Sequence, residues 1–285
     1  MPTDLKYLSV IESGLKPSAT SRSGAAGLWQ FMKPTGKMLG LKINSTVDER
    51  RDIEKSTRAA ADYLKQLYDR FDDWTLAIAA YNCGPGNLRK AIRKSGGKTT
   101  YWEIQQYLPR ETREYVPKFI AMSYMMNYYY EHDLIPALVG EELVNTSSAK
   151  VFEKMNLKNL SSELSIDFEV VKTLNPSYVT NYIPHTVDGK YNLVLPTPEM
   201  RIVATKYHVL AALPKLDERK NVEEEPTVDE TKTRSFISMP RPIGNILSTK
   251  NKNLPKVHSI QVHPISIDDR YIRFRPKEIR NRKRK

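Results

Sequence analysis

Hydrophobic spacing in the first 135 residues restricts this part of the chain to a helical fold. Apolar side chains recur every three or four residues over 53–71 and again over 115–129, with charged residues between them. That spacing is the period of an amphipathic helix. A short apolar run over 74–82 ends at Gly84-Pro85-Gly86, a sequence that terminates helices. Because no alternating pattern typical of strands is found here, the sequence predicts an all-α domain over residues 1–135.

Two shorter helices complete the predicted domain. One runs from about Thr3 to Ser13 and places Leu5 and Leu8 on one face. The other is basic, is expected to be capped by Asn87, and continues through Lys94 to a pair of glycines.

The chain changes character after this domain. Residues 136–150 lose the helical pattern and contain breakers and small polar residues, so they are expected to form a linker. Residues 151–198 contain two short helical segments, over 160–164 and 168–174, and a strand over 191–195. This pattern predicts a small α/β module. The fold expected for the whole chain is mainly α, followed by this module and a disordered basic tail within a low-order segment over 199–285.

The net charge of +12 belongs mostly to that tail. Residues 233–285 carry 14 basic and 3 acidic side chains, so the charge says little about the folded body. A solvated tail and an electrostatic contact with anionic envelope polymers or lipid head groups are both compatible with it. Nucleic-acid binding is disfavoured, because Tyr271 and Phe274 are the only aromatic residues near the terminal basic cluster.

Cysteine, histidine and long apolar runs carry no clear functional signal. The single cysteine, Cys83, excludes an intramolecular disulfide, and without a paired base we interpret it as a small half-buried residue. The five histidines are scattered and have no ligand partner at helical spacing, so no metal site is expected. No run is long enough for a membrane-spanning helix, and no secretory signal precedes the first helix.

Glu12 is an acid on the apolar face of its helix. It shares that face with Leu5 and Leu8, so its carboxyl group is expected to be desolvated. It also lies in the last turn, where the helix dipole disfavours a negative charge. Both effects raise the pKa, and an acid that is protonated near neutral pH can protonate a glycosidic oxygen. A solvated glutamate at a frayed helix end is the alternative that spacing alone leaves open.

Three downstream segments contain residues suited to a sugar ligand, although each also has a purely structural interpretation. Residues 21–31 combine two glycines with Trp29 and Gln30, which allows close approach of the backbone to a ligand or simply a turn that buries the tryptophan. Residues 80–82 place a phenol beside an amide. Residues 111–116 open the last helix with charged side chains that could be surface pairs.

In this order and spacing, the four segments closely resemble the motifs of the SLT-type lytic transglycosylases. These are goose-lysozyme-like enzymes of glycoside hydrolase family 23, here of the murein transglycosylase D kind. The matching motifs are Glu12-Ser13, Gly27-Leu28-Trp29-Gln30-Phe31, Ala80-Tyr81-Asn82 with Gly84-Pro85-Gly86, and Glu111-Thr112-Arg113-Glu114-Tyr115-Val116. The resemblance covers residues 1–135 and implies a lysozyme-like catalytic domain.

The resemblance also implies roles for individual residues. Glu12 would act first as general acid and then as general base, and Tyr115 would orient its carboxyl group. The remaining residues would bind substrate. Ser13 and Ser21 would line the catalytic centre, Gln30 would hydrogen-bond the glycan, and Tyr81 and Asn82 would shape the subsites beside the acid.

No second catalytic carboxylate is evident in the four motifs. Most glycosidases use a pair of acids, but Glu111 and Glu114 stand beside Arg110 and Arg113 and are expected to form surface pairs. The resemblance implies instead that the N-acetyl group of the muramyl sugar assists cleavage of the β-1,4 bond to N-acetylglucosamine. The C6 hydroxyl then attacks C1 and leaves a 1,6-anhydromuramyl end, without any cofactor.

The module over 151–198 resembles the second half of a LysM unit. The matching residues are Leu174-Asn175-Pro176, Ile183-Pro184 and Tyr191-Asn192-Leu193-Val194-Leu195-Pro196. The usual Gly-Asp/Glu-Thr-Leu opening is missing, so a spacer is as good an interpretation as a glycan-binding module.

Two other functions remain open from the sequence: a goose-type lysozyme that hydrolyses the same bond, and a non-catalytic peptidoglycan-binding protein. If the substrate is peptidoglycan strands, the protein works in the periplasm or cell envelope. We therefore expect an export segment upstream of the sequence given.

Overall fold

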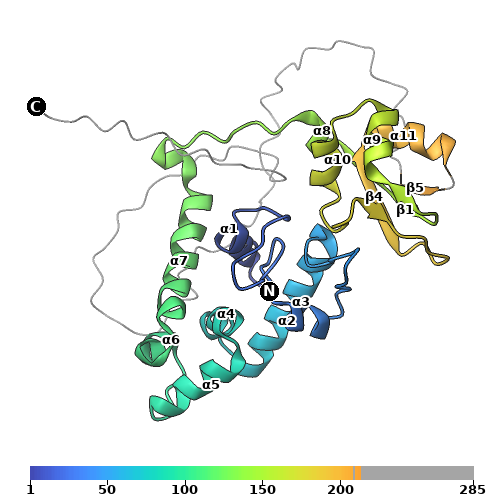
Figure 1. Ribbon diagram of the computed structural model, residues 1–285. Coiled ribbons are helices and arrows are strands. Elements are labelled where there is room, and N and C mark those ends of the chain that lie inside the picture. The colour runs from blue at the N-terminus through green and yellow to red at the C-terminus, as the bar shows by residue number, and fades with distance from the viewer. Residues whose placement is uncertain (208, 213–285) are drawn as a thin grey trace, which may run out of the picture. The chain divides into compact units, whose positions relative to one another are not determined.

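The computed structural model describes residues 1–207 and 209–212, all of which lie in one compact unit of the chain (Figure 1). The buried apolar side chains of these residues form two clusters. One lies among the helices of the first 126 residues, and the other lies in residues 149–211 and also contains Val47.

The amino-terminal part is helical, as the spacing predicts. Its elements are, in order, η1 (Thr3–Tyr7), α1 (Leu8–Ser13), α2 (Lys33–Met38), α3 (Ile53–Phe71), α4 (Trp74–Cys83), α5 (Pro85–Lys94), α6 (Tyr101–Ile104), η2 (Gln105–Tyr107), α7 (Arg110–Asn127) and η3 (Tyr129–His132). The helix predicted over residues 3–13 is present, but its first half is a 3-10 turn.

Helix α4 is the centre of this part. Residues 75–80 are all buried, and the helix packs against α3, α5 and α7 (Figure 1). A helix that is apolar on every side requires such neighbours. Asp73 begins α4 by accepting a hydrogen bond from the Leu76 amide at 2.8 Å, and Asp52 begins α3 in the same way at the Lys55 amide.

The expected start of the basic helix is wrong. Helix α5 begins at Pro85, and Asn87 lies within it, donating a side-chain hydrogen bond to the Cys83 carbonyl. Proline is favoured at the first position of a helix because its φ is already helical and it has no amide to satisfy. Gly84, with φ of 81°, makes the turn between α4 and α5.

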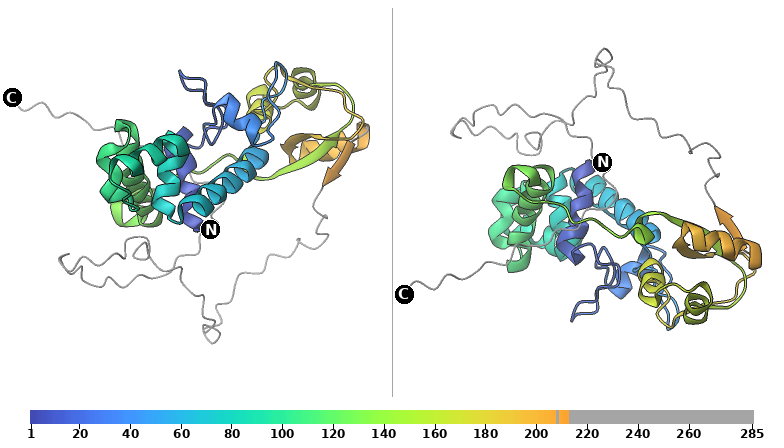
Figure 2. Two further views of the ribbon diagram at one scale, coloured as in Figure 1. Left: turned by 90° about the horizontal axis from the view of Figure 1, so that it is seen from below. Right: turned by 90° about the horizontal axis from the view of Figure 1, so that it is seen from above.

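The second cluster belongs to a small α/β module. Its elements are α8 (Glu141–Val144), β1 (Thr146–Val151), β2 (Met155–Asn156), α9 (Leu157–Leu164), α10 (Phe168–Leu174), β3 (Tyr182–Ile183), β4 (Tyr191–Pro196), α11 (Thr197–Lys206) and β5 (Val209–Ala212). Strand β1 lies between β4 and β5 in an antiparallel sheet, with Ala149 opposite Leu193 and Ala211. Helix α11 packs on this sheet (Figure 2).

The module extends beyond the range of 151–198 predicted from the sequence at both ends. Residues 146–150, expected to be linker, form most of the central strand, because Ser147, Ala149 and Val151 alternate into the buried face although two of them are small. Likewise, α11 and β5 lie largely within the segment from residue 199 onward that was expected to have little secondary structure. The expected helices and the strand over 191–195 are present. The prediction for the basic tail falls on residues 213–285, outside the described residues.

Among the residues that the structure describes, no helix combines the length and the apolar character needed to cross a membrane.

Candidate active site

Glu12 lies one residue before the end of α1, where the chain turns through Gly14 with φ of 59°. Leu5 and Leu8 on the same face are buried, as predicted. The carboxyl group of Glu12 accepts a hydrogen bond from the Tyr115 hydroxyl of α7. Residues 103 positions apart in the sequence are thereby joined at one side chain.

The pKa of Glu12 is raised from 4.5 to about 7. Burial is the largest cause; the hydrogen bond from Tyr115 opposes it, and repulsion from Glu111 adds a smaller rise. The sequence argument expected desolvation, and desolvation is the largest cause. The acid is therefore close to half protonated at neutral pH, which is the range in which a proton donor works best.

Two buried tyrosines stay protonated beside this acid. The pKa of Tyr115 and that of Tyr81 are both raised well above 10, by burial first and then by the negative charge of Glu12. Tyr115 is thus a permanent hydrogen-bond donor to Glu12 over the physiological pH range.

The loop over residues 24–31 is joined to the acid's surroundings through its carbonyl groups. The Ser13 hydroxyl donates to the Leu28 carbonyl at 2.9 Å, and the Tyr81 hydroxyl donates to the Trp29 carbonyl at 2.8 Å. Trp29 itself is buried, and its indole N–H donates to Thr57. The loop therefore does bury its tryptophan. Its carbonyl groups also connect Ser13, next to Glu12 in the chain, with Tyr81.

Gln30 and Ser21 lie in turns of this same region. Gln30 has a left-handed backbone, with φ of 48°, and its side-chain amide donates to the Gly27 carbonyl. The Ser21 hydroxyl accepts a hydrogen bond from the Ala25 amide at 3.0 Å. Within the described residues, no hydrogen bond connects either side chain to Glu12, in contrast to Tyr115.

Asn82 is held by a residue that the sequence analysis did not single out. Its side-chain oxygen accepts a hydrogen bond from the hydroxyl of Thr112, a buried residue of α7. Tyr63 was also missed, and its ring lies 5.8 Å from that of Tyr81. Thr112 sits inside the fourth motif, where its charged neighbours suggested an exposed surface, whereas nothing in the sequence marked Tyr63.

The expected pairing of Glu111 and Glu114 with arginines is wrong. Among the described residues no ion pair joins them to Arg110 or Arg113, and Glu114 pairs with Lys118 at 3.0 Å, one turn along α7. Glu111 acts on the site instead, through its repulsion of the Glu12 carboxylate.

The described residues contain no group of three or more metal-ligating side chains. Cys83 is half-buried, and burial raises the pKa of its thiol, which disfavours the reactive thiolate.

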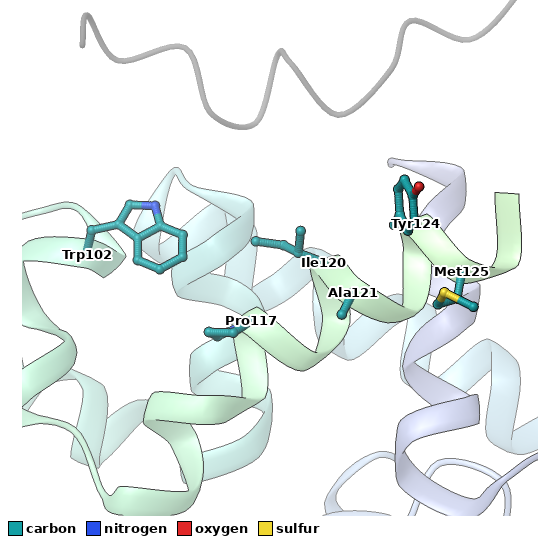
Figure 3. A pocket seen from close by; sticks show the side chains of 6 residues that line it. All are labelled: Trp102, Pro117, Ile120, Ala121, Tyr124 and Met125. Atoms are coloured by element: carbon teal, nitrogen blue, oxygen red, sulfur yellow. The ribbon is translucent and has the colours of Figure 1, made fainter. Parts of the chain in front are cut away.

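A shallow apolar depression of about 470 Å³ lies elsewhere on α7 (Figure 3). It is lined by Trp102, Pro117, Ile120, Ala121, Tyr124 and Met125. Ile120 and Tyr124 follow Tyr115 by five and nine residues, which at 3.6 residues per turn places them on the opposite side of the helix. This depression is therefore separate from the surroundings of Glu12.

Comparison with known proteins gives consistent matches. Residues 1–104 match the transglycosylase SLT domain. The chain is 46% identical over 127 residues to membrane-bound lytic murein transglycosylase D of Escherichia coli K12, covering 43% of this chain and 28% of that protein. It is 31% identical over 124 residues to the soluble lytic murein transglycosylase of the same strain, covering 41% of this chain and 19% of that protein.

The crystal structure of the 70 kDa soluble lytic transglycosylase from Escherichia coli also matches, with 28% identity and a TM-score of 0.39 over 46% of this chain and 22% of that one. This chain thus spans less than a third of the length of these relatives. Its similarity to the transglycosylase SLT domain covers residues 1–104.

Proposed function

We propose that this protein is a peptidoglycan lytic transglycosylase in which Glu12 is the only catalytic acid. The observation that supports this most strongly is the carboxyl group of Glu12, desolvated to a pKa of about 7 and oriented by Tyr115. The match to the transglycosylase SLT domain spans residues 1–104 and so includes Glu12, and the chain is similar to proteins named lytic murein transglycosylases.

In the proposed reaction, protonated Glu12 donates its proton to the β-1,4 glycosidic oxygen between N-acetylmuramic acid and N-acetylglucosamine. The C1–O bond breaks, with the muramyl N-acetyl group stabilising the positive charge at C1. The Glu12 carboxylate then takes the proton from the muramyl C6 hydroxyl, and that oxygen bonds to C1. Glu12 ends in its starting form, and the product is a 1,6-anhydromuramyl end.

A pKa near 7 suits both halves of this cycle. The group is acidic enough to donate a proton and basic enough to recover one at the same pH. Tyr115 stabilises the carboxylate that exists between the two steps, because a hydrogen bond to the charged form favours it.

The other site residues would bind the glycan and shape its subsites without taking part in the proton transfers. Tyr81 and Asn82 end α4 beside the acid and would form the adjoining subsites. Ser13 and Ser21 would line the centre through the loop that they hold, and Gln30 would contact the glycan through that loop. No cofactor enters this scheme.

Location follows from the proposed substrate. Peptidoglycan strands lie outside the cytoplasmic membrane, and the relatives are named membrane-bound or soluble murein transglycosylases. We therefore assign the protein to the periplasm or cell envelope, reached with an export segment.

The module that follows the helical part is proposed to be LysM-like, with glycan binding or spacing as its two candidate roles. Helices α9 and α10, which pack on each other, the contact of α10 with β4, and the Asn175 side chain that ties α10 to Val194 of that strand support the assignment. Binding of the full chain to sacculi, compared between the parent and Asn192→Ala in β4, distinguishes the roles. Reduced binding favours glycan recognition.

Product chemistry tests the proposed function. Purified sacculi are incubated with the protein, and the released muropeptides are analysed by mass spectrometry. We expect anhydro ends, which are lighter than hydrolysed ends by one water. Reducing ends would make the protein a goose-type lysozyme, and the absence of any release would favour a non-catalytic peptidoglycan-binding protein.

A further inference from the structure

Arg50 is a buried arginine outside the four motifs. It is 7% exposed, and its guanidinium group forms a two-bond pair with the Asp48 carboxylate, at 2.9 Å through Nε and 2.7 Å through Nη2. A buried ion pair is not in itself evidence of stability, because removing two charges from water costs as much as their attraction returns. Its role is therefore better sought in what the remaining donor of Arg50 binds.

That donor, Nη1, holds both ends of the loop over residues 24–31. It donates to the Gly24 carbonyl at 2.8 Å and to the Phe31 carbonyl at 2.9 Å. The main chain of Arg50 lies against the middle of the same loop, since a side chain at Gly27 would come within 1.7 Å of the Arg50 carbonyl oxygen. One residue thus contacts the loop at its start, middle and end.

Two carbonyls between these ends bind residues of the candidate active site. The Leu28 carbonyl accepts from Ser13, the neighbour of Glu12, and the Trp29 carbonyl accepts from Tyr81, whose pKa is raised by burial and then by the negative charge of Glu12. A displacement of the loop would therefore also displace Ser13 and Tyr81. The titratable groups that face Glu12 are Tyr115 and Glu111 from α7 and Tyr81 from α4, and none of them contacts Arg50.

Asp48 connects the pair to the α/β module. Its main-chain amide donates to the Ser177 carbonyl at 2.9 Å, and the amide of Val179 donates to the Thr46 carbonyl at 3.0 Å. Val47, between these two bonds, is 1% exposed and packs in the hydrophobic cluster of the module. The segment that carries Asp48 is therefore anchored to the module, and a few residues later it continues into α3.

We propose that Arg50, fixed by Asp48, is a positioning residue for the loop over 24–31 and that the module anchors this pair. The loop would keep water away from Glu12 and hold Ser13 and Tyr81 in place, so docking of the module would support the proposed catalytic centre. The catalytic consequence rests on the proposed function, whereas the positioning does not. The module would then be a structural part of the active site in addition to any glycan binding.

The test measures the titration of Glu12 in the full chain without substrate. The protein is labelled with ¹³C-glutamate, and the Glu12 carboxyl resonance is identified by its loss in Glu12→Gln. Arg50→Lys keeps the charge but cannot form the two-bond pair and also reach both carbonyls. Val47→Asp places a charge in the module cluster and weakens the anchor. Arg51→Lys is the matched control, because Arg51 binds the Ser18 carbonyl and Thr20 instead of the loop, and lysine keeps the positive charge that lies 3.8 Å from the Asp48 carboxylate.

We expect the pKa of Glu12 to fall by about one unit in Arg50→Lys and in Val47→Asp, since water entering beside the carboxyl group removes part of its desolvation. Arg51→Lys should leave it within the error of the parent. Hydrogen exchange of the 24–31 amides should accelerate in the first two variants only. A general loss of stability would lower the folded fraction without moving the titration of the folded protein.

The outcomes separate the two halves of the proposal. An unchanged Glu12 titration in folded Arg50→Lys overturns the positioning role. A shift in that variant but not in Val47→Asp overturns the anchoring role of the module. If Arg50→Lys does not fold, Asp48→Asn, which keeps the shape and one acceptor oxygen, takes its place in the same comparison. Because no substrate is present, absence of glycan cleavage would refute the proposed function and leave this test intact.

Discussion

At the scale of single residues, the account depends on one proton at Glu12. Its carboxyl group is held by Tyr115 and desolvated by its surroundings, and cleavage requires the protonated form. Activity should therefore decline as pH rises through about 7, the pKa of Glu12. Tyr115 and Glu111 influence the pH at which activity declines, because they shift the pKa of Glu12.

Tyr115→Phe should move this decline to higher pH. The lost hydrogen bond favoured the charged form, so its removal raises the pKa of Glu12. We also expect kcat to fall by roughly tenfold to a hundredfold, because the carboxyl group is no longer oriented. The pH dependence of kcat/KM on soluble glycan strands measures both effects, and a decline that moves to lower pH would refute the role given to Tyr115.

Glu12→Gln should stabilise the protein at alkaline pH. The folded pKa of about 7 lies above the unfolded value near 4.5, so the folded state binds the proton more tightly. The parent's stability is full below the unfolded pKa and declines between these two values, by at most about 3 kcal/mol. Urea unfolding at pH 4 and pH 8 measures the difference. Equal pH dependence in the two proteins would show that Glu12 is not desolvated.

At the scale of elements, the loop over 24–31 makes the strictest demand on sequence. Gly27 has φ of 87° and no room for a side chain beside the Arg50 carbonyl, whereas Gly24 has φ of 84° and open space. Alanine would be strained at both positions because of the positive φ. Only at Gly27 would its Cβ also collide with the Arg50 carbonyl.

Gly24→Ala should therefore cost about 1 kcal/mol of stability from backbone strain, and Gly27→Ala at least about 2 kcal/mol more from overpacking. Thermal or urea unfolding of the two variants separates the effect of the close Arg50 carbonyl from the effect of a positive φ. Equal losses would mean that the loop can move away from Arg50 freely, contrary to its role as a fixed support.

The helices could be predicted from spacing because their apolar stripes and terminators are local features. Glu12 could be singled out because its neighbours Leu5 and Leu8 are on the same helix. What joins Glu12 to Tyr115, or Asp48 to Arg50 and the module, depends on residues brought together by folding. A run of five charged residues, 48–52, gave no sign that three of them would be buried.

Strand β1 illustrates a different limit. Its inward residues are Ser147, Ala149 and Val151, which are too small to give a clear hydrophobic alternation. The central position between β4 and β5 supplies the burial, and this information is not contained in the segment itself.

At the scale of the whole molecule, the helical part and the module are connected by the covalent segment over 133–140 and by non-covalent contacts. These contacts include the packing of Val47 and the hydrogen bonds of Lys42 to Tyr191 and of Lys55 to the Lys190 carbonyl. Leu138 in that segment is fully exposed and Ile135 is 85% exposed, so this segment should be the first site of proteolysis within the described residues. Val47 precedes the cut and belongs to the module's cluster.

Limited digestion with thermolysin should thus give two fragments that remain together on gel filtration under native conditions and separate in denaturant. Mass spectrometry identifies the cut. Fragments that separate without denaturant would show that the contacts of Val47 do not hold the module, and would remove the anchor proposed for Asp48.

The central claim is that Glu12 alone supplies the catalytic proton. The most direct measurement compares the rate at which the parent, Glu12→Gln and Glu111→Gln release anhydromuropeptides from sacculi at pH 6. Glu12→Gln should lose at least about a hundredfold, whereas Glu111→Gln, which only weakens a repulsion on Glu12, should stay within about tenfold of the parent. Release by Glu12→Gln at the parental rate, or its complete loss in Glu111→Gln, would contradict the account.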